Sequence, residues 1–210
     1  LDLPFIMRTN HKITLEDIEQ FLGSHYQGTP FDPLGHDGTP ATRKLYRPIG
    51  LGRTQNSHIL QVRNDLPKNA NHIMWLCLGV PTFTPYVPFF SNATTVAPTY
   101  ATTPAKLNMN LRSAYWMYRV ISETVESYHS EFRQDDLDYL KDGREYMFGW
   151  VDKTAKAVEG KSDAETEQYL SEQTRLMDAE MGKRGKALLS KLLMHGMELS
   201  KLTFKMDKNL

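Results

Sequence analysis

Apolar, polar and proline positions divide the chain into two parts. All 11 prolines lie within residues 1–104. Charged residues show the opposite distribution, with 15 Asp, Glu, Lys and Arg up to Thr103 and 35 after it. Because proline cannot continue a helix or a central strand, the pattern predicts a strand-and-loop part over 1–104 and a helical layer with C-terminal helices over 105–210. The expected fold class is therefore α+β.

Two short apolar runs in the first part predict adjacent strands of one sheet, with a hairpin as one arrangement. They are "SHILQVR", residues 57–63, and "HIMWLCLG", residues 72–79. The second run is apolar at every position from Ile73 to Leu78. A strand of this kind is usually buried on both faces, which predicts layers on both sides of the sheet.

A short helix and two long loops account for the rest of the first part. The helix is expected within "ITLEDIEQFLGSHYQG", residues 13–28, because Thr14 and Asp17 have the spacing of a helix cap, and either Gly23 or Gly28 can end it. Residues 29–48 mix turn-forming residues with aromatic side chains, which favours an ordered loop. Residues 80–104, rich in Pro, Thr and aromatic residues, predict a second loop, and loops of this length tend to be functional.

Apolar residues recur at steps of three and four in the second part and predict three helices, each with an apolar stripe and a charged back. The first stripe consists of Leu111, Tyr115, Tyr118, Ile121, Val125, Tyr128 and Phe132. The second consists of Leu137, Leu140, Arg144, Met147, Val151 and Val158. The third helix has a capping box of Ser162 and Glu165. Its last part follows a heptad-like rhythm through Leu188, Leu192, His195, Leu199, Leu202 and Met206. This rhythm favours self-association.

Composition and charge narrow the class of protein. Apolar residues make up 40% and charged residues 24% of the chain, and the formal net charge is zero. These values are ordinary for a globular protein and do not indicate nucleic acid or an anionic membrane as a partner. No apolar run approaches the roughly 18 to 20 residues that cross a bilayer. A single cysteine, Cys77, excludes an intramolecular disulfide and suits a reducing compartment, so we expect a cytoplasmic protein.

The densest group of polar candidates lies in "RPIGLGRTQNSHILQVR", residues 47–63. Burial of a charge costs several kcal/mol unless the charge is paired. Arg53, followed by Thr54, Gln55 and Asn56, places many donors at the mouth of a strand, which suits binding of a carboxylate, a carbonyl oxygen or a thiolate. For Arg63, at the end of the predicted strand, a simpler explanation remains open, in which the side chain reaches solvent.

Other reactive residue types have simpler explanations. Cys77 lies within an apolar strand and is better explained as a small buried hydrophobe than as a nucleophile. His195 lies on the apolar stripe of the last helix and is expected in a core or an interface. Asp32, His36 and Asp37 form the only close group of His and carboxylates, and a solvated loop is favoured there over a metal site.

Three separated motifs resemble a known family. They are "HYQGTPFDPLG" over residues 25–35, "RPIGLGRTQNSHILQVR" over residues 47–63 and "MWLCLGVPTFTPYVPFFSN" over residues 74–92. Together they resemble the latter part of bacterial cysteine dipeptidases of the dipeptidase A family, which are N-terminal nucleophile hydrolases. The resemblance covers most of residues 1–160.

The resemblance implies a fold and a reaction. The fold is a four-layer αββα sandwich, of which this chain would be a part. The reaction is hydrolysis of dipeptides, in which the thiolate of an N-terminal cysteine attacks the carbonyl and its own α-amino group acts as base. No metal or organic cofactor is expected.

The chain departs from this pattern because Leu1 is not a nucleophile. We therefore expect the chain to be the C-terminal portion of a longer dipeptidase whose nucleophile lies upstream. Alone it is expected to be inactive. Its expected partners are the missing N-terminal portion, a dipeptide substrate and further copies of itself in a homo-oligomer.

The resemblance also suggests which residues lie near the site. The catalytic candidates are Arg53, Asn56 and His58, with Arg53 orienting the thiolate or binding a substrate carboxylate. The substrate-binding candidates are Tyr26, Asp32 and Arg47 from the upstream loop and Tyr86, Phe89 and Phe90 on the apolar side of the pocket.

Two other functions are compatible with the sequence. An amidase of the same superfamily would keep the fold and act on another small amide. A non-catalytic fragment would use residues 105–210 for helical assembly.

Overall fold

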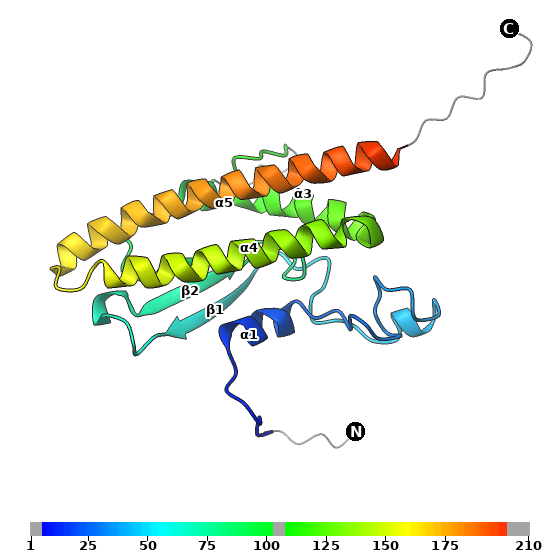
Figure 1. The fold of residues 1–210 in the computed structure, drawn as a ribbon, viewed down its shortest axis with the longest axis horizontal. Coiled ribbons are helices and arrows are strands. Elements are labelled where there is room, and N and C mark those ends of the chain that lie inside the picture. The colour runs from blue at the N-terminus through cyan, green and yellow to red at the C-terminus, as the bar shows by residue number, and fades with distance from the viewer. Residues whose placement is uncertain (1–5, 103–107, 201–210) are drawn as a thin grey trace, which may run out of the picture.

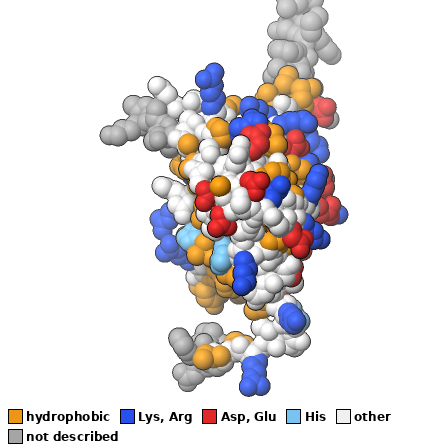
Figure 2. Space-filling view, turned by 90° about the vertical axis from the view of Figure 1, so that its left-hand side faces the viewer, with side chains coloured by type: hydrophobic (Ala, Val, Ile, Leu, Met, Phe, Trp, Pro, Cys, Tyr) orange, Lys and Arg blue, Asp and Glu red, His pale blue; other side chains and the backbone are white. Residues whose placement is uncertain are grey.

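The computed structural model describes residues 6–102 and 108–200. Figure 1 shows a small antiparallel sheet covered on one side by a layer of long helices, with the N-terminal helix and its following loop on the opposite side of α4 from α5. The α+β class is therefore confirmed. Figure 2, which views one end of the molecule, shows acidic and basic side chains intermixed, in line with the zero formal net charge.

The sheet contains three strands in the order β1-β2-β3. These are β1 (Ser57–Val62), β2 (His72–Cys77) and β3 (Val87–Phe90). Both pairs are antiparallel, with Ile59 opposite Trp75 and Trp75 opposite Pro88. The predicted hairpin of β1 and β2 is confirmed. Pro88 fits its strand because β3 is an edge strand within the described residues, where a missing N–H donor is tolerated.

The two faces of the sheet differ in burial. Ile73, Trp75 and Cys77 of β2 are buried, and Trp75 packs at 5.2 Å, centroid to centroid, from the ring of Phe148 in α4. On the opposite face Leu60 is 74% exposed. The prediction that layers cover both sides of the sheet therefore holds for one side in the described part of the chain.

Seven helical segments accompany the sheet in the described ranges. They are α1 (Leu15–Leu22), η1 (Thr42–Lys44), η2 (Lys68–Ala70), α2 (Pro98–Ala101), α3 (Ala114–Ser127), α4 (His129–Lys156) and α5 (Asp163–Leu199). The predicted capping boxes of Thr14 with Asp17 and of Ser162 with Glu165 are both formed. The three predicted helices of the second part are thus confirmed.

Two expectations about element boundaries were wrong. Residues 80–104 are not a continuous loop, because they contain β3 and α2. The stripe predicted from Leu111 to Phe132 does not lie on one helix either. Tyr128 has φ −129° and ψ 45°, so α3 ends before it and Phe132 belongs to α4. The spacing of apolar residues along the sequence gives no sign of this break, because a single non-helical residue hardly changes that spacing.

The core forms two clusters, both of which include residues of α5. One cluster lies under the sheet and includes Trp75, Val151 and Met177. The other lies along α3 and includes Leu188 and Leu192 of the heptad-like segment. These two leucines therefore pack within the chain, whereas Leu199 is exposed and Leu202 and Met206 lie outside the described residues. No described helix has the length and apolar character needed to span a bilayer.

Candidate functional site

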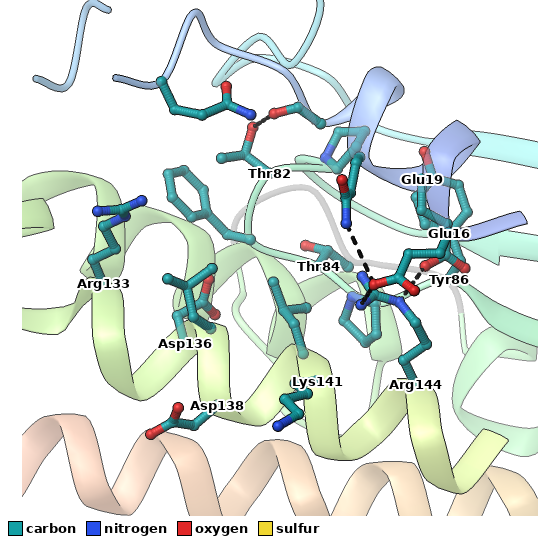
Figure 3. Close-up of a pocket in the computed structure, with 18 of the residues that line it drawn as sticks. Glu16, Glu19, Thr82, Thr84, Tyr86, Arg133, Asp136, Asp138, Lys141 and Arg144 are labelled. Carbon is teal, nitrogen blue, oxygen red and sulfur yellow. Dashed lines mark hydrogen bonds and ion pairs between the residues drawn. The ribbon is translucent and has the colours of Figure 1, made fainter. Parts of the chain in front are cut away.

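A cleft of about 850 Å³ opens between α1, the loop that precedes β3, and α4 (Figure 3). Its lining includes apolar side chains such as Phe83 and Phe148 together with charged groups of both signs. The charged residues are Glu16, Glu19, Arg133, Asp136, Asp138, Lys141, Arg144 and Glu145. A cavity of this size and mixed lining suits a small polar ligand.

Arg144 joins α1 to α4 at one side of the cleft. Its Nε donates to Glu19 Oε2 at 2.8 Å and its Nη1 to Glu16 Oε1 at 2.9 Å. Glu19 is 7% exposed, and burial raises the pKa of its carboxyl, although the adjacent guanidinium opposes the shift. The cation thus compensates a buried carboxylate that would otherwise be costly.

Asp136 of α4 is a buried acid without such a cation. It is 2% exposed and lines the cleft. Within the described residues its Oδ1 atom has no hydrogen-bond partner. Burial raises the pKa of this carboxyl well above its ordinary value, because the charged form would lose its hydration.

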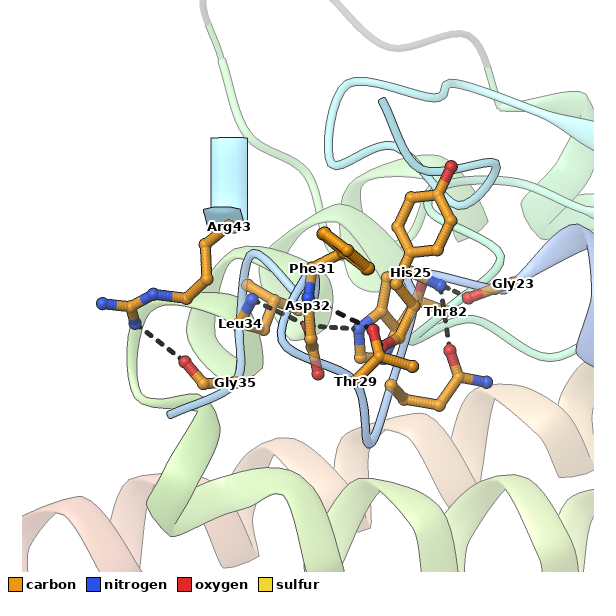
Figure 4. A network of polar contacts seen from close by, with 11 residues as sticks. Gly23, His25, Thr29, Phe31, Asp32, Leu34, Gly35, Arg43 and Thr82 are labelled. Carbon is orange, nitrogen blue, oxygen red and sulfur yellow. Dashed lines mark hydrogen bonds and ion pairs between the residues drawn. The ribbon is translucent and has the colours of Figure 1, made fainter. Parts of the chain in front are cut away.

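A histidine and an aspartate form a buried pair beside the cleft (Figure 4). His25 Nδ1 lies 2.8 Å from Asp32 Oδ1, which also accepts the backbone N–H of Leu34 at 2.8 Å. The His25 ring contacts the His129 ring edge to face at 5.8 Å. Burial lowers the pKa of His129, and the neighbouring His25 adds to the effect. This pair fixes the turn of the "HYQGTPFD" motif against the start of α4.

Cys77 is not a nucleophile in this structure. Its side chain is fully buried, with Sγ 3.7 Å from the Thr84 carbonyl oxygen. Burial raises the pKa of the thiol well above its ordinary value, so the reactive thiolate is disfavoured. The prediction of a small buried hydrophobe agrees with this environment.

The predicted catalytic residues do not line the cleft. Arg53 and Asn56 are exposed in the segment before β1, and His58 is exposed on the same face of β1 as Leu60. Ser57, which stands between Asn56 and His58, nevertheless accepts the hydroxyl hydrogen bond of Tyr86, and Tyr86 lines the cleft.

The predicted substrate-binding residues occupy three places. Tyr86 lines the cleft and donates from its hydroxyl to Ser57 Oγ at 2.8 Å. Tyr26 donates to the Arg47 carbonyl oxygen at 3.2 Å, and Asp32 is bound to His25. The aromatic rings of Phe89 and Phe90 pack against those of Tyr100 and Trp150. Of this group, Tyr86 alone is placed in the cleft.

Sequence reasoning missed His25, Glu19 and Asp136. A signal for Asp136 was present, because it lies four residues after the buried Phe132 and one turn before the half-buried Tyr139. The expected stripe began at Leu137, which is exposed. The predicted apolar stripe therefore began one position too late on α4 and did not include Asp136.

No group of three or more His, Cys, Asp or Glu side chains in residues 6–102 and 108–200 is arranged to hold a metal ion. His36 and Asp37, which form one group with Asp32 in the sequence, are exposed in the loop. Asp32 is instead bound to His25.

Comparison with known proteins places the chain in a family. The model of "Peptidase family C69" matches residues 1–142. The chain belongs to peptidase family C69. It is 44% identical over 209 residues to a "Probable dipeptidase" from Latilactobacillus sakei, covering 100% of this chain and 43% of that protein. It is 42% identical over 122 residues to "Dipeptidase A" from Lactobacillus helveticus, covering 58% of this chain and 25% of that protein.

These matches confirm the resemblance to bacterial dipeptidases of the dipeptidase A family. The chain spans less than half the length of these relatives. The matches to both proteins are therefore matches to a portion of each.

Proposed function

We propose that this C69 family chain is the C-terminal portion of a cytoplasmic dipeptidase. The observation that carries the proposal is the identity of 44% to a probable dipeptidase over the whole of this chain. The N-terminal cysteine of a segment upstream supplies the nucleophile, and its α-amino group acts as the base. This chain then contributes a sheet, a helical layer and walls of the substrate site.

The arrangement of layers supports a four-layer αββα sandwich as the complete fold. One face of the sheet is covered by α4 and α5, and the other carries Leu60 and Val62 with exposures of 74% and 60%. Exposed aliphatic residues on a sheet face are typical of a surface that packs against another layer. The upstream segment supplies the second sheet in this proposal.

Arg53, Asn56 and His58 act at the active centre of this complete enzyme. Arg53 and Asn56 are exposed before β1, and His58 is exposed on the uncovered face of β1, which leaves their donors available to the upstream segment. Arg53 orients the cysteine thiolate or binds the substrate carboxylate, because a guanidinium can donate two hydrogen bonds to one anion.

Expression of the complete protein encoded by the gene tests this function. It is expected to hydrolyse unblocked dipeptides, whereas the 210-residue chain alone is expected to be inactive because it lacks the nucleophile. Hydrolysis of dipeptides by the isolated chain would contradict the assignment. Faster turnover of N-acyl amides than of dipeptides would favour the amidase alternative.

The homo-oligomer is a separate proposal that rests on the last turns of α5. Leu193, Met194 and Met197 are 66%, 58% and 62% exposed there. The double variant Leu193→Lys and Met197→Lys is expected to have a lower mass than the parent, as measured by light scattering. An unchanged mass would count against this interface. Assembly through α5 without any hydrolysis by the complete protein would favour the non-catalytic alternative.

A further inference from the structure

We propose that Asp136 binds the free amino group of the dipeptide in the cleft between α1 and α4. The inference rests on the proposed dipeptidase function and assigns one specificity-determining contact to this chain. It explains how an enzyme of this kind would distinguish a dipeptide from a blocked peptide.

Within the described residues Asp136 differs from Asp135 in having no counter-ion and from Asp138 in having no hydrogen-bond partner at Oδ1. Asp135 binds Lys191 Nζ at 2.8 Å and lies 3.1 Å from His195 Nδ1. Asp138 accepts a hydrogen bond from the side-chain amide of Gln134 at 2.8 Å. Asp136 is more deeply buried than either, and its Oδ1 has no partner in the described residues.

A ligand ammonium supplies what Asp136 lacks. A buried carboxyl without a hydrogen-bond partner is costly to leave unsatisfied. A cation at hydrogen-bond distance stabilises the ionised carboxylate, whose proton passes to solvent on binding, and so removes that cost. An acetylated nitrogen carries no charge and offers one donor instead of three. The site therefore prefers a dipeptide with a free amino group.

The charge pattern of the cleft also fits the opposite end of a dipeptide. Arg133 lies one turn before Asp136 on α4, and Figure 3 shows both side chains rising from the same side of the helix. Arg133 forms no ion pair within the described residues. The two residues are about 4.5 Å apart along the helix axis, and a dipeptide spans about 7 Å. The long Arg133 side chain covers the difference and meets the carboxylate, and in this arrangement Arg53 keeps the other proposed role, that of orienting the thiolate.

Binding to the 210-residue chain gives the first test, because no turnover is expected to disturb the measurement. Calorimetry compares leucylglycine with N-acetyl-leucylglycine for the parent chain, Asp136→Asn and the matched control Asp142→Asn. Asp142 is an exposed acid on the same helix and outside the cleft. The parent and control are expected to bind leucylglycine at least tenfold more tightly than its acetylated form. Asp136→Asn is expected to lose this preference.

Kinetics of the complete protein give the second test. Asp136→Asn is expected to raise KM for leucylglycine at least tenfold with a much smaller change in kcat, while its melting temperature does not fall below the parent value. A variant that only disturbed the fold would lower the melting temperature. Equal KM values in Asp136→Asn and the parent overturn the inference, as does a chain that binds neither peptide.

The two proposals fail in different ways. Absence of dipeptide hydrolysis by the complete protein overturns the proposed function, whatever Asp136 does. Hydrolysis that persists with an unchanged preference for free dipeptides in Asp136→Asn overturns the contact and leaves the function intact.

Discussion

Asp136 and Glu19 line the same cleft, and burial raises the pKa of both carboxyls. They differ in their partners, because Arg144 is bonded to Glu19 and no hydrogen bond reaches Oδ1 of Asp136 in the described residues. The sequence alone could not separate them. The ion pair of Glu19 joins residues far apart in the chain, and the burial of Asp136 depends on which side of α4 meets the sheet.

Asp136 makes the stability of the chain depend on pH. A carboxyl whose pKa is raised by folding keeps its proton longer in the folded state than in the unfolded state. Its contribution is therefore fully present below the unfolded pKa of about 3.9 and is lost as the pH rises through the folded pKa. The asparagine side chain of Asp136→Asn cannot ionise, so the variant does not lose stability in this way as the pH rises.

Urea unfolding of the parent chain and Asp136→Asn at pH 5 and pH 8 measures the effect. The variant is expected to gain stability relative to the parent as the pH rises. Asp142→Asn is the control, because Asp142 is exposed and its substitution is expected to leave the difference unchanged. A constant difference between Asp136→Asn and the parent at both pH values would contradict the role of burial.

Arg53 carries the prediction for catalysis at this scale. Arg53→Gln in the complete protein is expected to reduce kcat/KM for dipeptides by at least tenfold, because loss of one donor at a reacting centre typically costs about 10²–10³ in rate. Its melting temperature is expected to stay unchanged because the side chain is exposed. Arg112→Gln, at another exposed arginine, serves as the control. An unaffected rate in Arg53→Gln would remove it from the active centre.

The helices were predictable to the extent that local chemistry determines them. Both capping boxes follow from residues three positions apart, and the structure contains them. β3 was missed because Pro88 argues against a strand, and its place at an edge depends on pairing with a distant strand. The break at Tyr128 has no proline or glycine to mark it, so only the packing of α3 and α4 fixes its position.

The cap of α5 allows a prediction for a whole element. Ser162 accepts the backbone N–H of Glu165 at 3.4 Å, while the Glu165 carboxylate accepts the N–H of Ser162 at 2.9 Å. Ser162→Ala is expected to lower the free energy of unfolding by about 1 kcal/mol. Ser190→Ala, at an exposed position inside the same helix, is expected to be neutral or slightly stabilising because alanine favours helices. Equal midpoints of urea unfolding for the parent and Ser162→Ala would show that the cap is not needed.

At the scale of the whole molecule, the sheet within residues 6–102 has unequal faces, and the sequence predicted this only in part. The continuous apolar run in β2 predicts burial on both faces. The structure buries Ile73, Trp75 and Cys77 under the helical layer and leaves Met74 and Leu76 half-buried. The relatives are more than twice as long as the matched region. Whether another layer covers the second face must therefore be determined in the complete protein.

Leu60 tests whether the uncovered face is an internal surface of the complete protein. Leu60→Lys is expected to change the melting temperature of the 210-residue chain little, because the side chain is 74% exposed there. In the proposed four-layer fold the lysine would be buried against a second sheet, and an unpaired buried charge costs several kcal/mol. The variant is therefore expected to melt at a lower temperature than the parent and to lose dipeptidase activity.

Leu176→Lys is the matched control, since Leu176 is 43% exposed on α5, away from the sheet. It is expected to leave both the chain and the complete protein near their parent melting temperatures. A complete protein that tolerates Leu60→Lys as well as Leu176→Lys would show that this face meets solvent in both forms. The sheet and its helical layer would then form a two-layer structure on their own. The upstream segment would have to form the active centre without packing on the exposed face of the sheet.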